Sequence, residues 1–118
     1  MEFVSFELAK KLKEKGFNEV CYDYYEPLMH CLNKIKTPCT NEDGESCGII
    51  TAPTISQVLK WLREKKGIHI CISLGTYSDW DCEISKIDGN VYCNAYCGCH
   101  DYGQAALVGI SFVIDELI

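Results

Sequence analysis

Cysteine and histidine side chains gather near the end of the chain, in a pattern that can bind metal. Cys93, Cys97, Cys99 and His100 all lie within the stretch 93–100. Three thiolates and one imidazole make the tetrahedral ligand set of structural zinc sites. Common zinc motifs instead use two separated C-x2-4-C pairs, and adjacent ligands such as Cys99 and His100 need a sharp backbone turn to converge. A zinc site is therefore one alternative, and a buried strand cysteine followed by turn residues is the other.

A cysteine near a histidine also has the residue types of a nucleophilic enzyme. Cys71 and His69 are two positions apart on an expected strand, so both side chains face the same side. Such neighbours are about 7 Å apart, too far for a direct hydrogen bond. No nucleophile-elbow or protease-type sequence surrounds any cysteine. The sequence thus favours a non-enzymatic protein, with a thiol-dependent enzyme as an alternative.

The composition excludes several classes of protein. The chain of 118 residues is long enough for one domain with a single core. Its net charge of −6 disfavours nucleic-acid binding, because that affinity comes mostly from Lys and Arg on phosphates. No apolar run approaches the roughly 20 residues of a membrane span, and the start of the sequence lacks the pattern of a signal peptide. Nine cysteines, an odd number, fit the reduced thiols of a cytoplasmic protein better than a complete disulfide framework.

The first half of the chain predicts a helix, a strand and a long loop. Ser5 is expected to cap a helix that runs to about Lys15 and ends at Gly16. Alternation of residue types over 20–25 predicts a short strand. The segment at about 26–52 has no period and contains Pro, Gly, Asn and Asp residues, so we expect a long irregular loop.

The second half predicts a helix followed by strands. Apolar residues at i, i+3, i+4 and i+7 over 55–62 indicate a helix that Gly67 ends. Strict alternation over 68–74 and again over 80–85 predicts two half-buried strands. The residues of these strands that face away from the core form a candidate binding face: His69, Ser73, Asp81 and Glu83.

The end of the chain predicts a hairpin and a last helix. Asp88-Gly89 is a hairpin turn before a third strand at 91–95. Asp101 is expected to cap the closing helix, with Gln104 three residues later in a capping box. This helix is apolar over a wide arc, so we expect it to lie between a sheet and other helices, or to pack against a second subunit.

The predicted order of elements is α-β-α-β-β-β-α. Antiparallel strands with segregated helices indicate an α+β fold of two layers, with a sheet of about four strands and helices on one face. We expect a single domain over 1–118.

Most of the chain resembles a family of small uncharacterised proteins found in gut anaerobes and in their phages or mobile elements. The resemblance covers the segment from Phe3 to Tyr25, Ala52-Pro53-Thr54, the run 61–70 and the closing 102–109. These motifs are caps, a helix-to-strand turn and an apolar helix, and the cysteine cluster is not among them. The resemblance implies a biological context and no activity, cofactor or catalytic residue.

These observations predict an accessory or binding protein of phage or mobile-element origin that acts in the cytoplasm through protein contacts. The partner is expected to be an unidentified protein, or a second copy of the chain, because exposed strand edges invite pairing. No nucleic-acid or membrane partner is expected, and the only cofactor considered is the zinc ion of the alternative above.

Overall fold

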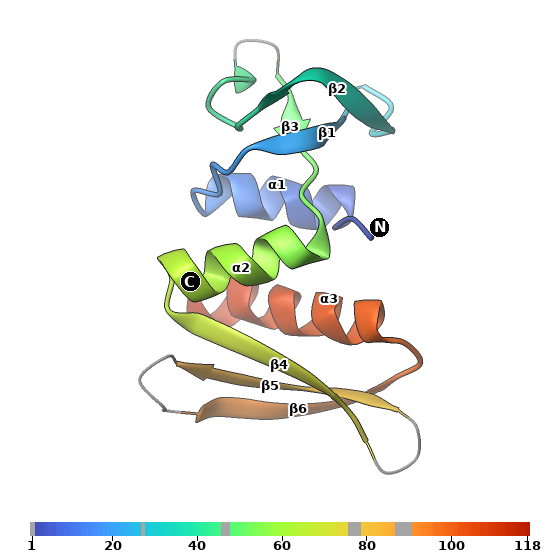
Figure 1. Cartoon of the computed structure of the whole chain (residues 1–118), viewed down its shortest axis with the longest axis vertical. Helices are drawn as coiled ribbons and strands as arrows, with labels where there is room; N and C mark the ends of the chain where they lie inside the picture. Colours follow the sequence, from blue (N-terminus) through green and yellow to red (C-terminus); the bar gives the residue numbers. More distant parts are fainter. Residues whose placement is uncertain (1, 27, 46–47, 76–78, 87–90) are drawn as a thin grey trace. The chain divides into compact units, whose positions relative to one another are not determined.

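A computed structural model describes residues 2–26, 28–45, 48–75, 79–86 and 91–118, with the backbone alone at 36–37 and 91–98 (Figure 1). The chain divides into two compact units, Met1–Thr54 and Ile55–Ile118, and each is described by itself. The first unit contains α1 (Phe6–Glu14), β1 (Cys21–Tyr25), β2 (Leu32–Cys39) and β3 (Ile50–Thr51). The second contains α2 (Ile55–Lys65), β4 (Ile68–Leu74), β5 (Trp80–Lys86), β6 (Val91–Cys99), α3 (Tyr102–Phe112) and the π-helical turn η2 (Val113–Leu117).

Helix α1 begins and ends as the sequence predicts. The Ser5 hydroxyl accepts a hydrogen bond from the backbone N–H of Leu8 at 3.2 Å, which satisfies one of the N–H groups that a helix start leaves without a partner. At the other end Gly16 has a φ of 90°, the left-handed conformation that glycine adopts without a Cβ penalty. Leu8 and Leu12 are buried, so these residues form the apolar stripe of the helix.

The first unit has a three-stranded antiparallel sheet in the order β2-β1-β3. In β1, Cys21 and Asp23 are buried and Tyr22 between them is exposed, which is the alternation expected of a strand with one covered face. Phe6 of α1 contacts the Tyr25 ring edge-on at 5.7 Å, and the His30 ring stacks on Phe6 at 3.7 Å. The start of the helix is thus packed against the end of β1 and the turn that follows it.

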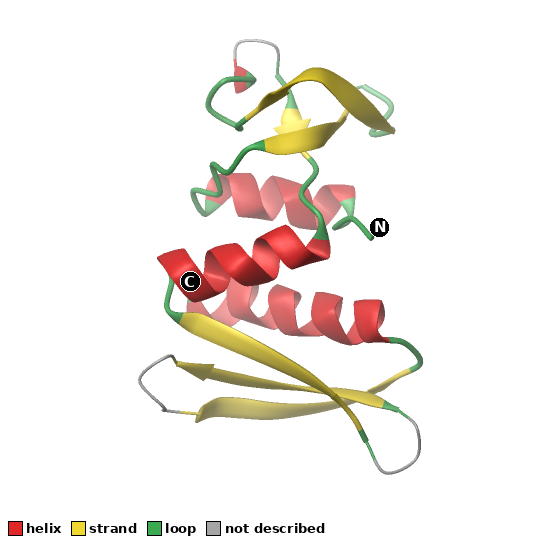
Figure 2. Ribbon diagram, in the orientation of Figure 1, coloured by secondary structure: helices red, strands yellow, loops and turns green. Residues whose placement is uncertain are grey.

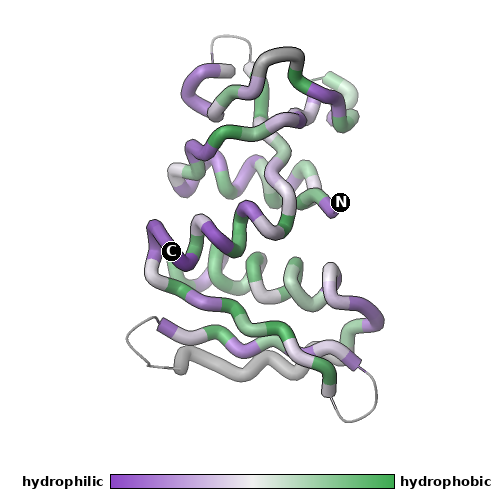
Figure 3. The backbone as a smooth tube through the Cα atoms, viewed as in Figure 1, coloured by the Kyte–Doolittle hydropathy of each residue, from purple (hydrophilic) through white to green (hydrophobic). Residues whose placement is uncertain are grey.

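In the second unit, α2 and α3 lie on one face of a three-stranded antiparallel sheet in the order β4-β5-β6 (Figures 1 and 2). Asp101 caps α3 by accepting a hydrogen bond from the Gln104 N–H at 2.8 Å, as the sequence predicts. Helix α3 is hydrophobic along most of its length (Figure 3), and it contacts both α2 and the sheet. Because α3 is covered by α2 and by the sheet, apolar residues occupy a wide arc of its surface.

One glycine sets how closely α3 approaches the sheet. A Cβ atom built on Gly109 would lie 3.0 Å from Ile70 Cγ2 and 3.4 Å from Cys82 Sγ. Ile70 and Cys82 are both buried on the covered face of β4 and β5. A side chain at position 109 would therefore require Ile70 and Cys82 to move.

The prediction of an α+β fold with antiparallel strands and helices on one face is confirmed. Two details differ. The expected irregular loop at 26–52 contains β2 and β3, and the strands form two sheets of three rather than one of about four. β2 has no clean period because residues 31–34 are all exposed, and β3 is only two residues long. The predicted Asp88-Gly89 turn lies outside the described residues, although β5 and β6 pair antiparallel on either side of it.

No helix in the described ranges combines the length and the apolar character that crossing a membrane requires.

Candidate functional site

The face of β4 and β5 that points away from α2 and α3 carries the candidate binding residues. The two strands pair in register, so that His69 lies opposite Ser85, Cys71 opposite Glu83 and Ser73 opposite Asp81. Side chains of directly opposed residues share one face, with Cβ atoms about 4.5–5.5 Å apart. We call this surface the β4–β5 outer face, defined by His69, Cys71, Ser73, Asp81, Glu83 and Ser85. It contains all four residues of the binding face that the sequence predicts.

The β4–β5 outer face is exposed and acidic. Cys71, Ser73 and Glu83 are exposed, and the other three residues are half-buried. None of the six residues is Lys or Arg, so the carboxylates of Asp81 and Glu83 set its charge. Along β4 the alternation with buried Ile68 and Ile70 places these polar residues on the solvent side.

One carboxylate oxygen of Asp81, Oδ1, is buried and accepts no hydrogen bond within the described part of the chain. Its Oδ2 atom lies 2.7 Å from where a Cβ of residue 75 would stand, so a side chain at that position would require the carboxylate to move. A buried carboxylate oxygen without a donor costs free energy.

On this face the Cys71 thiol and the His69 imidazole are not directly opposed. His69 lies opposite Ser85 and not opposite Cys71, so its imidazole and the thiol are same-strand neighbours about 7 Å apart. The residue beside Cys71 on the next strand is Glu83. The face therefore offers acceptors and charge for contacts.

Three of the predicted metal ligands are spread along β6 of the same sheet, at positions 93, 97 and 99, and His100 directly follows the strand. In the backbone register Cys93 pairs with Ile84 and Cys99 pairs with Trp80. The side chains of Cys93 and Cys97 lie outside the described residues. Cys99 is half-buried and His100, the next residue, is exposed. Among the described side chains no three His, Cys, Asp or Glu residues converge in a metal-binding group, and the zinc site stays a prediction.

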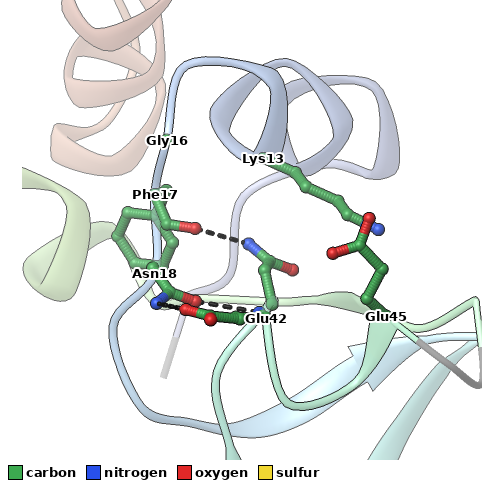
Figure 4. A pocket seen from close by; sticks show the side chains of 7 residues that line it. Lys13, Gly16, Phe17, Asn18, Glu42 and Glu45 are labelled. Carbon is green, nitrogen blue, oxygen red and sulfur yellow. Dashed lines mark hydrogen bonds between the residues drawn. The ribbon is translucent and has the colours of Figure 1, made fainter.

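The first unit contains a cleft that the sequence did not indicate (Figure 4). It has a volume of about 300 Å³ and lies where the end of α1 meets the turn after β2. Its walls mix charged, amide and aromatic side chains: Lys13, Gly16, Phe17, Asn18, Asn41, Glu42 and Glu45.

Most polar groups of the cleft already bond within the chain. Asn18 and Glu42 form a reciprocal pair, in which the Asn18 amide donates to Glu42 Oε2 at 3.1 Å and the Glu42 N–H donates to Asn18 Oδ1 at 2.8 Å. The Lys13 ammonium donates to the Ile49 carbonyl at 3.5 Å, and its side chain reaches toward Glu45 in Figure 4. These contacts fasten the turn to the helix, so they explain the cleft without a ligand.

The turn that forms one wall had a recognisable sequence pattern. Thr40 and Asp43 have capping-box spacing, and they exchange hydrogen bonds in that manner. The Asp43 N–H donates to the Thr40 hydroxyl at 3.1 Å, and the Thr40 N–H donates to the Asp43 carboxylate at 3.3 Å. This pattern would have placed an ordered turn inside the segment expected to be irregular.

Comparisons of the chain with protein-family models, with curated proteins and with solved structures gave no match. The candidate sites are therefore assigned from geometry and chemistry alone.

Proposed function

We propose that this chain is a non-enzymatic binding protein that docks a positively charged segment of a protein partner on the β4–β5 outer face. The observation that carries the proposal is the in-register row of polar residues on an exposed sheet face, with Asp81 and Glu83 and no basic residue among them. Complementary charge steers such encounters and fixes their orientation.

The two carboxylates support a cationic occupant. Glu83 is exposed and Asp81 is half-buried, and a Lys or Arg side chain is the strongest donor that a protein partner can bring to a carboxylate. A second copy of the chain is disfavoured on this face, because its own Asp81 and Glu83 would meet carboxylates of the same sign.

The wider context of the proposal comes from the sequence. The resemblance to small proteins of gut anaerobes supports a phage or mobile-element origin, and the number of thiols supports action in the reducing cytoplasm. A homodimer would use other surfaces, namely the edge strands of the two sheets, which are β2, β3, β4 and β6.

A defined probe tests the proposal. The full chain is titrated with a fluorescent peptide of alternating lysine and serine, and the Kd is measured by anisotropy at low and at physiological salt. Glu83→Lys places a like charge in the docking face, so we expect it to weaken binding about tenfold. Glu116→Lys, the same change at an exposed acid of η2, is the matched control and should change Kd less than about twofold.

Two outcomes would refute the proposal. Equal losses in Glu83→Lys and Glu116→Lys would mean that the peptide responds to net charge and not to this face. A dimer in sedimentation that Glu83→Lys dissociates, together with no peptide binding, would make a second copy the occupant.

A further inference from the structure

Two cysteines of the first unit lie directly opposite each other on neighbouring strands. Cys21 of β1 pairs with Cys39 of β2 in the antiparallel register. Opposed residues in such a pair have Cα atoms about 4.5 or 5.5 Å apart and side chains on the same face. Both spacings fall within the about 4.4–6.8 Å that a disulfide spans. The backbone register therefore meets the Cα spacing that a disulfide requires.

The two thiols differ in access to solvent. Cys21 has 0% of its surface exposed and its thiol donates to the Glu19 carbonyl at 3.6 Å, whereas Cys39 is half-buried. Burial raises the pKa of the Cys21 thiol to about 11, and the neighbouring Cys39 adds to that rise. A dissolved reagent can reach Cys39 first, and Cys21 only through Cys39.

We propose that Cys21 and Cys39 form a modification site at which a small disulfide of the glutathione type converts the two thiols into one intramolecular disulfide. In the first step the Cys39 thiolate attacks one sulfur of the small disulfide, which releases one small thiolate and leaves a mixed disulfide on Cys39. In the second step Cys21 gives its proton to solvent and its sulfur attacks the Cys39 sulfur, which releases the second small thiolate. Two cysteine thiols are oxidised and one small disulfide is reduced to two thiols.

The bond would fix the base of the β1–β2 hairpin. Cys21 and Cys39 are the outermost described pair of the two strands, since the register then shifts to Asp23 opposite Lys34. At the other end of the hairpin Leu28 is 86% and Met29 is 76% exposed. A disulfide would restrict the unfolded chain between the two cysteines and so stabilise the first unit. This inference is independent of the β4–β5 outer face.

Peptide mapping tests the bond. The reduced full chain is incubated with oxidised glutathione, remaining thiols are alkylated under denaturing conditions, and the digest is analysed by mass spectrometry. We expect a peptide linked through Cys21 and Cys39 in the wild type and none in Cys39→Ser. Cys31→Ser is the matched control, because Cys31 is an exposed thiol on the same hairpin that is not opposite a cysteine, and this variant should still form the link.

The distribution of products decides the outcome. Glutathione that remains on Cys39 while Cys21 stays fully alkylatable would overturn the proposal, as would Cys39 linked to other cysteines as often as to Cys21.

Urea unfolding gives a second readout. The oxidised wild type should unfold at a higher urea concentration than the reduced wild type, and Cys39→Ser should show no such difference. A lower midpoint after oxidation would mean that the bond does not fit the native strands.

Discussion

A single oxygen of Asn41 holds Thr51 by two hydrogen bonds. Asn41 Oδ1 accepts from the Thr51 N–H at 2.9 Å and from the Thr51 hydroxyl at 3.0 Å, while the Asn41 amide donates to the Phe17 carbonyl at 2.8 Å. Both side chains are buried, and Thr51 is 0% exposed. The turn after β2 is thereby fastened both to β3 and to the end of α1.

Loss of this amide should destabilise the first unit. Asn41→Ala leaves the buried N–H of Thr51 and the carbonyl of Phe17 without these partners, so we expect the free energy of unfolding to fall by about 2–3 kcal/mol in urea titrations. Asn33→Ala is the matched control, because Asn33 is exposed on β2 and its amide only approaches the Cys31 carbonyl at 3.4 Å. Similar unfolding midpoints for both variants would contradict the role of Asn41.

Close approach of α3 to its sheet makes position 109 intolerant of side chains. Gly109→Val places a branched side chain where even a Cβ lies 3.0 Å from Ile70, so we expect about 1–3 kcal/mol of destabilisation or more, measured by thermal or urea unfolding. Ser111→Val introduces the same side chain two positions along the same helix, at a half-buried site, and should cost much less. Equal costs would show that helix propensity alone explains the effect.

The Cys21 thiol should make stability fall in alkaline solution. Burial, with smaller contributions from Cys39, Asp23 and Glu19, raises its pKa in the folded chain from 9.0 to about 11. The unfolded chain releases this proton first, so the contribution is complete below about pH 9 and is lost as pH rises to about 11. The urea midpoint of the wild type should drop between about pH 9 and about pH 11, and Cys21→Ala should drop less. An equal drop of the urea midpoint in the wild type and in Cys21→Ala would mean that other titrating groups cause the loss of stability.

The zinc alternative makes its own prediction. If Cys93, Cys97, Cys99 and His100 hold an ion, protein purified under reducing conditions without added metal should carry about one zinc per chain, with thiols masked until a chelator is added. Cys99→Ser should lower that zinc content, and Cys71→Ser, an exposed thiol on β4, should not. Metal-free protein with all thiols titratable after denaturation would end this alternative.

The sequence predicted those parts of the fold that a local pattern determines. Ser5, Gly16 and Asp101 mark helix ends because capping involves residues close in the chain. The alternation of Ile68 and Ile70 with His69 identified β4 because one face of that strand is buried. The candidate binding face followed directly, since a period of two assigns every residue of a strand to a face.

The parts that were missed depend on pairing between distant residues. β2 is an edge strand, and residues 31–34 are all exposed. Because neither face of this segment is buried, its sequence does not alternate between apolar and polar residues. β3 exists only through its pairing with β1 and the contact of Thr51 with Asn41. The opposition of Cys21 and Cys39 likewise depends on the register across a bulged hairpin, which composition and spacing do not determine.

The central claim is that the β4–β5 outer face binds a cationic segment, and backbone amide NMR of the full chain tests it most directly. Amide shifts are followed during titration with the lysine–serine peptide at physiological salt. The account predicts shift changes concentrated in β4 and β5, around Asp81 and Glu83, and lost in Glu83→Lys. Changes spread evenly over the acidic residues of both units, or centred away from these two strands, would contradict it.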